Sequence, residues 1–316
     1  MEANAVEIRK MLVLDRAGGI VLQVPGFTLT HGEVCGVYGG SFEGANLFLS
    51  CVSGLRQPHE GRIRIYGKAL ESSALSKYPL GVLPRDGGLF SDLSVRENVR
   101  LALRFSGPRK RSRGEQTKLL RRMSEILELE RWMETPSNRL PGGVRQRVSL
   151  ACALAHEPWL LVADDPWGAA DIESRELIER ALREHCDRGN TLLFASPREE
   201  ECEGLASEIC LFNRTTLVAR GTMNHLQKYV DTQESIVVRV QDQASLLVEP
   251  ISSLSGVLNC KATDRTVTIQ ASPGTIRLTR LAEHVQSLGL ELLDMHIQKP
   301  GLSEIYAAVV GQGDDR

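Results

Sequence analysis

The chain has 316 residues, which is long enough for one large and one small domain that each bury a core. Hydrophobic residues make up 42% and charged residues 25%, and Lys+Arg 38 against Asp+Glu 40 leaves a formal net charge of -2. This balance provides no global positive field, so nucleic acid is excluded as an expected partner.

The cysteines and the apolar runs indicate which cellular compartment to expect and whether the chain crosses a membrane. Seven cysteines are scattered without a CxxC motif, and the histidines show no metal-ligand spacing, so we expect reduced cytosolic thiols and no metal site. Residues 1–13 carry several charges and predict no signal peptide. Apolar runs reach only about five residues, against the roughly 20 that span a bilayer. A membrane role is therefore expected only through a partner.

The first elements in chain order have the layout of a phosphate-binding loop. Residues 8–30 predict two short strands around Gly18-Gly19, and residues 34–38 predict a short buried strand. The glycine-rich segment 39–44 follows, and a helical pattern then runs through Leu47 and Val52 to Gly54. A strand, a glycine turn and a helix in this order indicate a site for phosphate at the helix N-terminus.

The next elements predict an α/β core. Residues 61–66 alternate as a half-exposed strand, and residues 95–134 are helical and highly charged with an interruption at 108–113. Residues 159–163 and 191–195 are compact apolar strands with a helix at 172–186 between them. Residues 209–212 and 217–219 form a last hairpin. Alternating strands and helices predict a parallel sheet covered by helices.

The pattern changes beyond about residue 227. A strand at 235–240, a helix at 244–254, and two strand segments within 257–271 are followed by further elements: a helix at 276–288, a strand at 290–297 and a final helix at 302–310. The order β-α-β-β-α-β predicts a small ferredoxin-like or similar α+β module. We therefore expect two domains, residues 1–226 and residues 227–316, with the boundary near 225–234.

Five segments, in one order and at one spacing, resemble the ATP-binding subunits of ABC transporters. They are Gly39-x4-Gly44, residues 54–67, residues 90–98, residues 140–148, and residues 160–166 with Asp171 five residues on. The resemblance covers residues 12–223. It implies a P-loop NTPase-like cassette with a parallel core sheet, an antiparallel β subdomain and a helical subdomain at about 85–150, followed by the C-terminal module.

The phosphate loop departs from the family after its last glycine. In the family, a lysine there pairs with the β- and γ-phosphates, and the next Ser/Thr hydroxyl ligates Mg²⁺. Here these positions are Ala45 and Asn46, and Glu43 adds a negative charge beside the expected phosphate. Each lost charge-assisted hydrogen bond is worth roughly 1.5–3 kcal/mol, so the site formed with Gly39 and Gly44 is expected to be vestigial. Alternatively, the glycine segment is only a tight turn.

The catalytic positions implied by the resemblance also differ. Asp164 keeps the family's Mg²⁺-ordering carboxylate, but Asp165 stands at the general-base position and reaches one methylene less than glutamate. Pro197 replaces the switch histidine, and its side chain neither donates nor accepts a hydrogen bond. Arg85 replaces the Q-loop glutamine, and Ala17 stands where an adenine-stacking aromatic is expected. The sequence therefore names no confident catalytic residue.

The segment 140–148 resembles the family's signature motif, and it keeps some of the motif's residues and replaces others. In the family it caps the γ-phosphate of ATP bound to the opposite subunit. Leu140, Gly142 and Gly143 are retained, whereas Pro141 replaces the serine and removes a hydroxyl and an N–H. The glycine N–H groups could cap a partner's ATP, or the segment is only a helix start. Asp171 takes the D-loop position, where the family communicates across the dimer.

The C-terminal end resembles an extension of ABC exporters that move drugs or lipid-linked polymers. The segment 299–306 matches a Pro-x-Leu-x-Glu-hydrophobic-aromatic helix of that extension. Leu302, Ile305 and Tyr306 would share one apolar face, because they are spaced i, i+3 and i+4. In such exporters the extension is thought to be regulatory or to contact the dimer mate.

Three functions are compatible with these residues. The first is a degenerate cassette of a membrane ABC exporter, peripheral at the cytoplasmic face, that dimerises with itself or with an active cassette and couples to a transmembrane subunit. ATP and Mg²⁺ would then be weakly held or held by the partner. The second is a scaffold cassette in a non-transport machine for motility, pilus or cell-envelope assembly. The third is an active ATPase with a rewired site that uses Asp164, Asp165 and Arg85.

Overall fold

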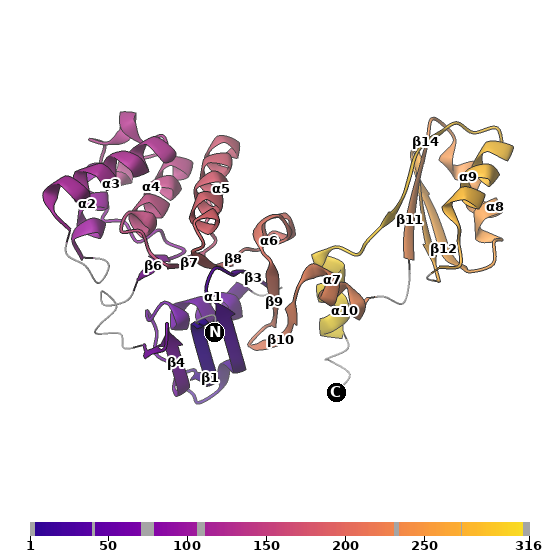
Figure 1. Cartoon of the computed structure of the whole chain (residues 1–316). Helices are drawn as coiled ribbons and strands as arrows, with labels where there is room; N and C mark the ends of the chain where they lie inside the picture. The colour runs from indigo at the N-terminus through magenta and orange to yellow at the C-terminus, as the bar shows by residue number, and fades with distance from the viewer. Residues whose placement is uncertain are drawn as a thin grey trace. The chain divides into compact units, whose positions relative to one another are not determined.

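The computed structural model describes residues 4–39, 42–70, 79–105, 111–230, 234–272 and 274–311. The chain divides into two compact units, Met1–Thr222 and Met223–Arg316 (Figure 1). Each unit has a hydrophobic core of its own. Within the described ranges, no helix combines the length and hydrophobicity that crossing a bilayer requires.

A mixed sheet forms the centre of the first unit. The strand order among the described residues is β5-β4-β1-β2-β10-β9-β3-β8-β7-β6. Neighbouring strands from β9 to β6 pair in parallel, those from β5 to β2 pair antiparallel, and β10 joins the two groups. The predicted parallel core and antiparallel β subdomain are confirmed. The bounds are β1 Asn4–Leu14, β2 Ile20–Thr30, β3 Val34–Gly39, β4 Glu60–Ile65, β5 Lys68–Ala69, β6 Leu80–Leu83, β7 Leu160–Asp164, β8 Thr191–Ala195, β9 Glu208–Asn213 and β10 Thr216–Gly221.

Helices cover this sheet and form a separate group beyond it. The helix α1 (Phe42–Val52) contacts β3, β7 and β8. The helices α2 (Val95–Phe105), α3 (Arg113–Ile126) and α4 (Gly142–Leu154) gather together, with α5 (Ile172–Asp187) beside α4 (Figure 1). The short α6 (Glu199–Leu205) contacts β3. The helical subdomain predicted at about 85–150 corresponds to the group that contains α2, α3 and α4.

The two central strands are buried along their full length. All five residues of β7 and all five of β8 are buried, as expected for parallel strands covered on both faces. Their continuous apolar sequences leave Asp164, the last residue of β7, as the buried carboxylate of the strand. The carboxyl ends of parallel strands lie at one edge of the sheet, so β3 and β7 deliver Gly39 and Asp164 to the same edge.

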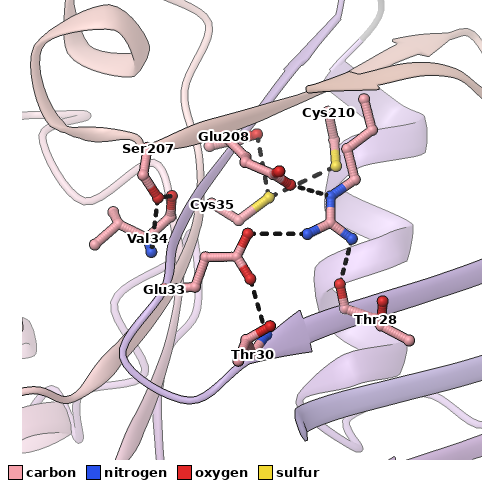
Figure 2. Close-up of polar contacts among 10 residues, drawn as sticks. Thr28, Thr30, Glu33, Val34, Cys35, Ser207, Glu208 and Cys210 are labelled. Carbon is pink, nitrogen blue, oxygen red and sulfur yellow. Dashed lines mark hydrogen bonds and ion pairs between the residues drawn. The ribbon is translucent and has the colours of Figure 1, made fainter. Parts of the chain in front are cut away.

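Arg220 joins β10 to the neighbouring strands. Its guanidinium donates to Glu33 at 3.1 Å, to Glu208 at 2.7 Å and to the carbonyl oxygen of Thr28. The same group lies 4.7 Å from the centre of the Phe27 ring. Figure 2 shows the carboxylates of Glu33 and Glu208 near one another, with Thr28 on the neighbouring strand. One cation thus neutralises two partly buried carboxylates where the antiparallel and parallel parts of the sheet meet.

Two buried thiols lie beside this cluster. The sulfur atoms of Cys35 on β3 and Cys210 on β9 are 3.6 Å apart, and both side chains are fully buried (Figure 2). The hydrogen bond between them, together with burial, raises the pKa of the Cys35 thiol. Both cysteines are free thiols, so they act here as small apolar residues of the core.

The second unit contains an antiparallel sheet of order β12-β13-β11-β14. This is the order that a β-α-β-β-α-β chain gives in a ferredoxin-like module, so the predicted arrangement is confirmed. The helices α8 and α9 lie on one side of the sheet (Figure 1), and Leu302 and Ile305 of α10 are buried. The bounds are α7 Met223–Leu226, β11 Glu234–Val240, α8 Val248–Ser252, β12 Val257–Thr263, β13 Thr266–Ala271, α9 Leu278–Ser287, β14 Leu292–Gln298 and α10 Leu302–Gly311.

One predicted helix of this unit is wrong in its extent. Residues 244–254 were expected to form a single helix, but Ala244–Leu247 is a 3₁₀-helix and only Val248–Ser252 is α-helical. Pro250 has no backbone N–H and cannot bond to the carbonyl of Leu246, so it is tolerated only within the first turn of a helix. The α-helix therefore starts two residues before the proline.

Candidate nucleotide site

The segment between β3 and α1 is shorter than the predicted glycine loop. The strand ends at Gly39 and the helix begins at Phe42, and Gly40 and Ser41 lie outside the described residues. The prediction of a loop over 39–44 is therefore wrong for its second half, because Gly44 is helical. Ala45 and Asn46 follow it in the same helix.

Close backbone packing explains the two glycines. A Cβ on Gly44 would lie 1.9 Å from the carbonyl oxygen of Arg214, in the turn between β9 and β10. A Cβ on Gly39 would lie 2.5 Å from the carbonyl oxygen of Phe212. Neither distance is compatible with any side chain, because the neighbouring atom is backbone. Gly44 therefore lets the start of α1 approach the turn between β9 and β10, and Gly39 lets the end of β3 approach the end of β9.

Ala45 faces the interior of the protein. It is 0% exposed and belongs to a core cluster with Phe48, Val37 and Val162. A lysine at this position would carry its ammonium group out of the core, or leave it there without a partner. The methyl group of alanine fits the cluster without either requirement.

Asn46 and Asp164 form a direct contact between α1 and β7. The amide nitrogen Nδ2 of Asn46 donates to Oδ2 of Asp164 at 2.6 Å, and Oδ1 of Asn46 accepts from the Ser50 hydroxyl at 3.5 Å. The other carboxylate oxygen of Asp164, Oδ1, is buried and has no hydrogen-bond partner among the described residues. Asp164 itself is only 6% exposed.

Burial alters the acidity of both carboxylates at the end of β7. Desolvation, with a smaller contribution from the charge of Asp165, raises the pKa of Asp164 to about 6, and Arg85 opposes this. The pKa of Asp165 is also raised, first by burial and then by the charge of Glu201, while Arg85 and Arg175 oppose the shift. Arg85 is therefore the cation that both carboxylates share.

Asp165 lies in a turn that neighbouring side chains hold. Its φ of 51° is in the left-handed region, which Asp tolerates better than most residues, and its N–H donates to the carbonyl oxygen of Ala195 at 3.0 Å. The side-chain amide of Gln146, from α4, donates to the carbonyl oxygens of Asp165 and Pro166 at 3.1 and 3.0 Å. Gln146 belongs to the motif at residues 140–148, but its contact with the turn after β7 was not predicted, because the motif does not show which backbone groups its amide reaches.

A second network surrounds the position of the switch histidine. Pro197 is exposed, and the hydroxyl of the preceding Ser196 is buried and donates to Glu201. Glu201 also pairs with Arg175 of α5 and lies 3.7 Å from Arg198. Three consecutive acids, Glu199, Glu200 and Glu201, form the first turn of α6, and glutamate side chains are mostly solvated in folded proteins. Glu201 is instead 9% exposed in its side chain, and its charge is neutralised within the protein.

Two cavities adjoin Asn46 and Arg85. One, of about 260 Å³, also contains Asp164 and Asp86 in its wall, and the other, of about 660 Å³, is lined by Val21, Glu43, Leu47 and Arg214 among others. The cations of these cavities are guanidinium groups and the larger cavity contains an exposed carboxylate, Glu43. The charged groups of these cavities therefore differ from those of a phosphate site in which a single lysine binds the phosphates.

The orientation of the Asn46 amide beside Asp164 does not fit a magnesium ion. Mg²⁺ requires oxygen ligands at 2.0–2.1 Å in octahedral geometry. Here an amide nitrogen is directed at the carboxylate oxygen that would be a ligand or hold a ligating water. A hydroxyl at residue 46 would present an oxygen instead. Among the described residues, no group of three or more His, Cys, Asp or Glu side chains is arranged to hold a metal ion.

The signature and D-loop residues lie together at a second place. Pro141 is the residue before α4, and no side chain caps the N-terminus of that helix. Asp171 caps α5, since its Oδ1 accepts from the N–H of Ser174 at 2.8 Å, and this bond lowers the pKa of Asp171. A Cβ on Gly143 would lie 2.5 Å from the Ser174 hydroxyl and 3.0 Å from Oδ2 of Asp171. Leu140 is buried and Gly142 is half-buried.

The fold and these two sites define an ATP-binding cassette. The sequence model described as ABC transporter matches residues 22–168. Among similar proteins, the linearmycin resistance ATP-binding protein LnrL of Bacillus subtilis (strain 168) is 25% identical over 90% of this chain and 92% of its own length. The Nod factor export ATP-binding protein I of Rhizobium etli is 28% identical over 92% of this chain and 89% of its own length. The sulfate/thiosulfate import ATP-binding protein CysA of Nephroselmis olivacea is 31% identical over 71% of this chain and 70% of its own length.

Solved structures agree on the fold. A dimeric post-hydrolysis structure of the cassette MJ0796 bound to ADP and Pi matches with a TM-score of 0.63 and 24% identity, covering 69% of this chain and 98% of that one. A structure of the ATP-binding subunit of an ABC transporter matches with a TM-score of 0.65 and 22% identity, over 72% and 93%. The chain belongs to the ABC transporter family, in which it is an ATP-binding-cassette subunit.

Proposed function

We propose that this chain is a non-catalytic or weakly active cassette subunit of a membrane ABC exporter. It pairs with a second cassette, a catalytically competent one, and docks beneath a transmembrane subunit at the cytoplasmic face of the membrane. Its own nucleotide site, formed by Gly39, Gly44, Ala45, Asn46 and Asp164, is vestigial. Motion of the partner's ATP-driven cycle passes through its helical subdomain.

The contact between Asn46 and Asp164 carries this proposal. The Asn46 amide nitrogen lies 2.6 Å from Oδ2 of Asp164, at the position where the family has a Mg²⁺-ligating hydroxyl, and this supports a site that holds the ion weakly or not at all. Placement of Ala45 in the core adds to this, because no charged group extends from that position toward phosphate. Asp165 and Pro197 supply a shorter base and no hydrogen-bonding side chain at the remaining catalytic positions.

The relatives support export over import. LnrL, a resistance protein, and the Nod factor export protein align over about nine tenths of this chain, which includes the C-terminal module. Coverage of the cassette alone does not separate the two directions, because the sulfate/thiosulfate import protein aligns over 71% of this chain and three other Nod factor export proteins align over 62–64% of it. The support for export is the alignment of LnrL and the Rhizobium etli protein through the C-terminal module.

The signature segment supports a role toward a partner's nucleotide. The N-terminus of α4 has no side-chain cap, so the backbone N–H groups of Gly142 and Gly143 remain suited to an anion. Asp171 contributes by fixing the start of α5 against Gly143. In this proposal the chain completes the partner's ATP site with Leu140, Pro141, Gly142 and Gly143, although its own site is inactive.

Two measurements test the proposal. The purified chain alone is expected to have negligible ATPase activity, and a robust rate that Asp164→Asn abolishes would overturn this and favour a rewired active enzyme. Purification of the tagged full chain from membranes is expected to yield a second cassette and a transmembrane subunit. Recovery of filament or periplasmic proteins in their place would favour a non-transport machine.

A further inference from the structure

A groove of about 850 Å³ runs along α9 in the C-terminal module. It lies between this helix and the segment that follows α8, and its apolar wall includes Leu254, Ile276 and Leu281. Leu281 is 1% exposed and belongs to the module's core, so the floor of the groove is continuous with that core. The groove therefore offers apolar contact area to a bound molecule.

Three nitrogen-bearing side chains line the groove at the start and along one face of the helix. Arg280 and His284 are four residues apart in α9 and so lie on one face, and Arg277 is the N-cap residue immediately before the helix. Arg277 and Arg280 are exposed, and neither forms an ion pair with an acid in the part of the chain that the structure describes. Glu283 is also in the wall, so two guanidinium groups face one carboxylate there.

His284 provides an independent observation. Its ring atom Nε2 is shielded from solvent but has no hydrogen-bond partner among the described residues. A buried polar atom without a partner loses its hydration and gains nothing in exchange. His284 lines the groove, so a turn of its imidazole ring would bring this nitrogen to the groove surface, where an anion would accept its hydrogen bond and would also pair with the two arginines.

We propose that this groove binds a small organic anion, a carboxylate or phosphate ester that carries an apolar chain. The anionic group lies against Arg277, Arg280 and Nε2 of His284, and the apolar chain lies on Leu254, Ile276 and Leu281. Both contacts are required, because an inorganic anion gains nothing from the floor and an uncharged hydrocarbon leaves the histidine unpaired.

Isothermal titration calorimetry of the full chain tests the site with octanoate, octyl phosphate and inorganic phosphate as probes. The two amphiphilic anions are expected to bind at one site and inorganic phosphate more weakly. Arg280→Gln and His284→Phe are each expected to weaken octanoate binding about tenfold, since each removes one charge-assisted or buried hydrogen bond. Circular dichroism of each variant checks that the module remains folded.

Lys261→Gln is the matched control, because it removes one positive charge from an exposed position on β12 outside the groove. Its affinity for octanoate should stay within about twofold of the unaltered chain. Flotation with phosphatidylglycerol vesicles, compared with phosphatidylcholine vesicles, distinguishes a lipid headgroup from a soluble ligand. The proposal is overturned if no probe and no vesicle binds in a manner that depends on Arg280 and His284.

Discussion

Asn46 changes the chemistry of the site through one amide group. Its nitrogen lies 2.6 Å from Oδ2 of Asp164, and the second carboxylate oxygen has no hydrogen-bond partner among the described residues. Such a pair stabilises the resting contact between α1 and β7 but leaves Asp164 costly to ionise. The raised pKa of Asp164, about 6, expresses that cost.

Asp164→Asn is expected to stabilise the protein at neutral pH. Below about pH 4 the carboxyl is protonated in the folded and the unfolded chain, since its unperturbed value is 3.8. Between about pH 4 and pH 6 the Asp164 carboxyl is ionised in the unfolded chain but protonated in the folded chain, so the free energy of unfolding falls as the pH rises. Above pH 6 the variant should be more stable by on the order of 2 kcal/mol, because it avoids this cost.

Urea unfolding of both proteins at several pH values between 4 and 7.5 measures this difference. The exposed Asp92→Asn is the control and should differ from the unaltered chain by a constant amount, within about 0.5 kcal/mol. If the Asp164→Asn variant is less stable than the unaltered chain at pH 7, or equally stable at every pH measured, the carboxylate does not lie at a desolvated position.

Ala45→Lys is expected to destabilise the fold without restoring activity. The side chain at residue 45 faces the core cluster, so the lysine must bury a charge or displace its neighbours, at a cost of about 2–4 kcal/mol. Denaturant unfolding and an ATPase assay measure the two effects. Glu43→Lys adds a lysine at an exposed position of the same helical turn and should cost no more than about 1 kcal/mol. Unchanged stability together with gained Mg·ATP binding in Ala45→Lys would contradict the position assigned to Ala45.

At the scale of elements, the start of α1 depends on how closely the helix approaches the β9–β10 turn. Gly44→Ala would place a methyl group 1.9 Å from the carbonyl oxygen of Arg214, and backbone cannot move aside as a flexible side chain can. We expect a loss of about 2 kcal/mol or more in the free energy of unfolding.

Gly114→Ala is the comparison for that variant. Gly114 lies in the first turn of α3, and a Cβ there would meet no atom within 4 Å. Alanine has the higher helix propensity, so this change should leave stability unaltered or raise it by up to about 1 kcal/mol. Equal effects of the two substitutions, measured by thermal unfolding, would mean that α1 does not approach the turn this closely.

Much of the element order could be predicted from the sequence, for a physical reason. The strands β7 and β8 are continuous apolar runs of five residues, and α5 begins after a capping Asp171. These are local signals. The start of α1 at Phe42 was not predicted, because glycines at 39 and 44 indicate a turn when the chain is considered alone. Their actual role arises from contact with β9, which is more than 160 residues further along the chain.

The same limit applies to the site. Motif spacing placed Asp164, Asp165 and Arg85 near one another, and the structure brings them together. The direction of the Asn46 amide and the pairing of Glu201 with Arg175 could not be predicted, because each depends on side-chain geometry between separate elements. Arg220 was missed for that reason too, since its partners come from other strands.

At the scale of the whole molecule, the chain has a cassette fold with two kinds of surface. One is the pocket around Asn46 and Asp164, which has Ala45 and Asn46 at the positions of the lysine and hydroxyl side chains that we propose are needed to hold ATP. The other is the segment from Leu140 to Gly143, whose glycines remain. A cassette in which only the signature segment is functional can still take part in ATP-driven motion, provided that the partner cassette binds the nucleotide. Both cores were predicted, as was the separate α+β module.

Calorimetric titration of the full chain with ATP, with and without Mg²⁺, tests the central claim most directly. The account predicts binding weaker than about 0.1 mM and no gain in affinity when Mg²⁺ is added, because the Asn46 amide takes the place of a metal ligand. Micromolar affinity that requires Mg²⁺ and is lost in Asp164→Asn would contradict it.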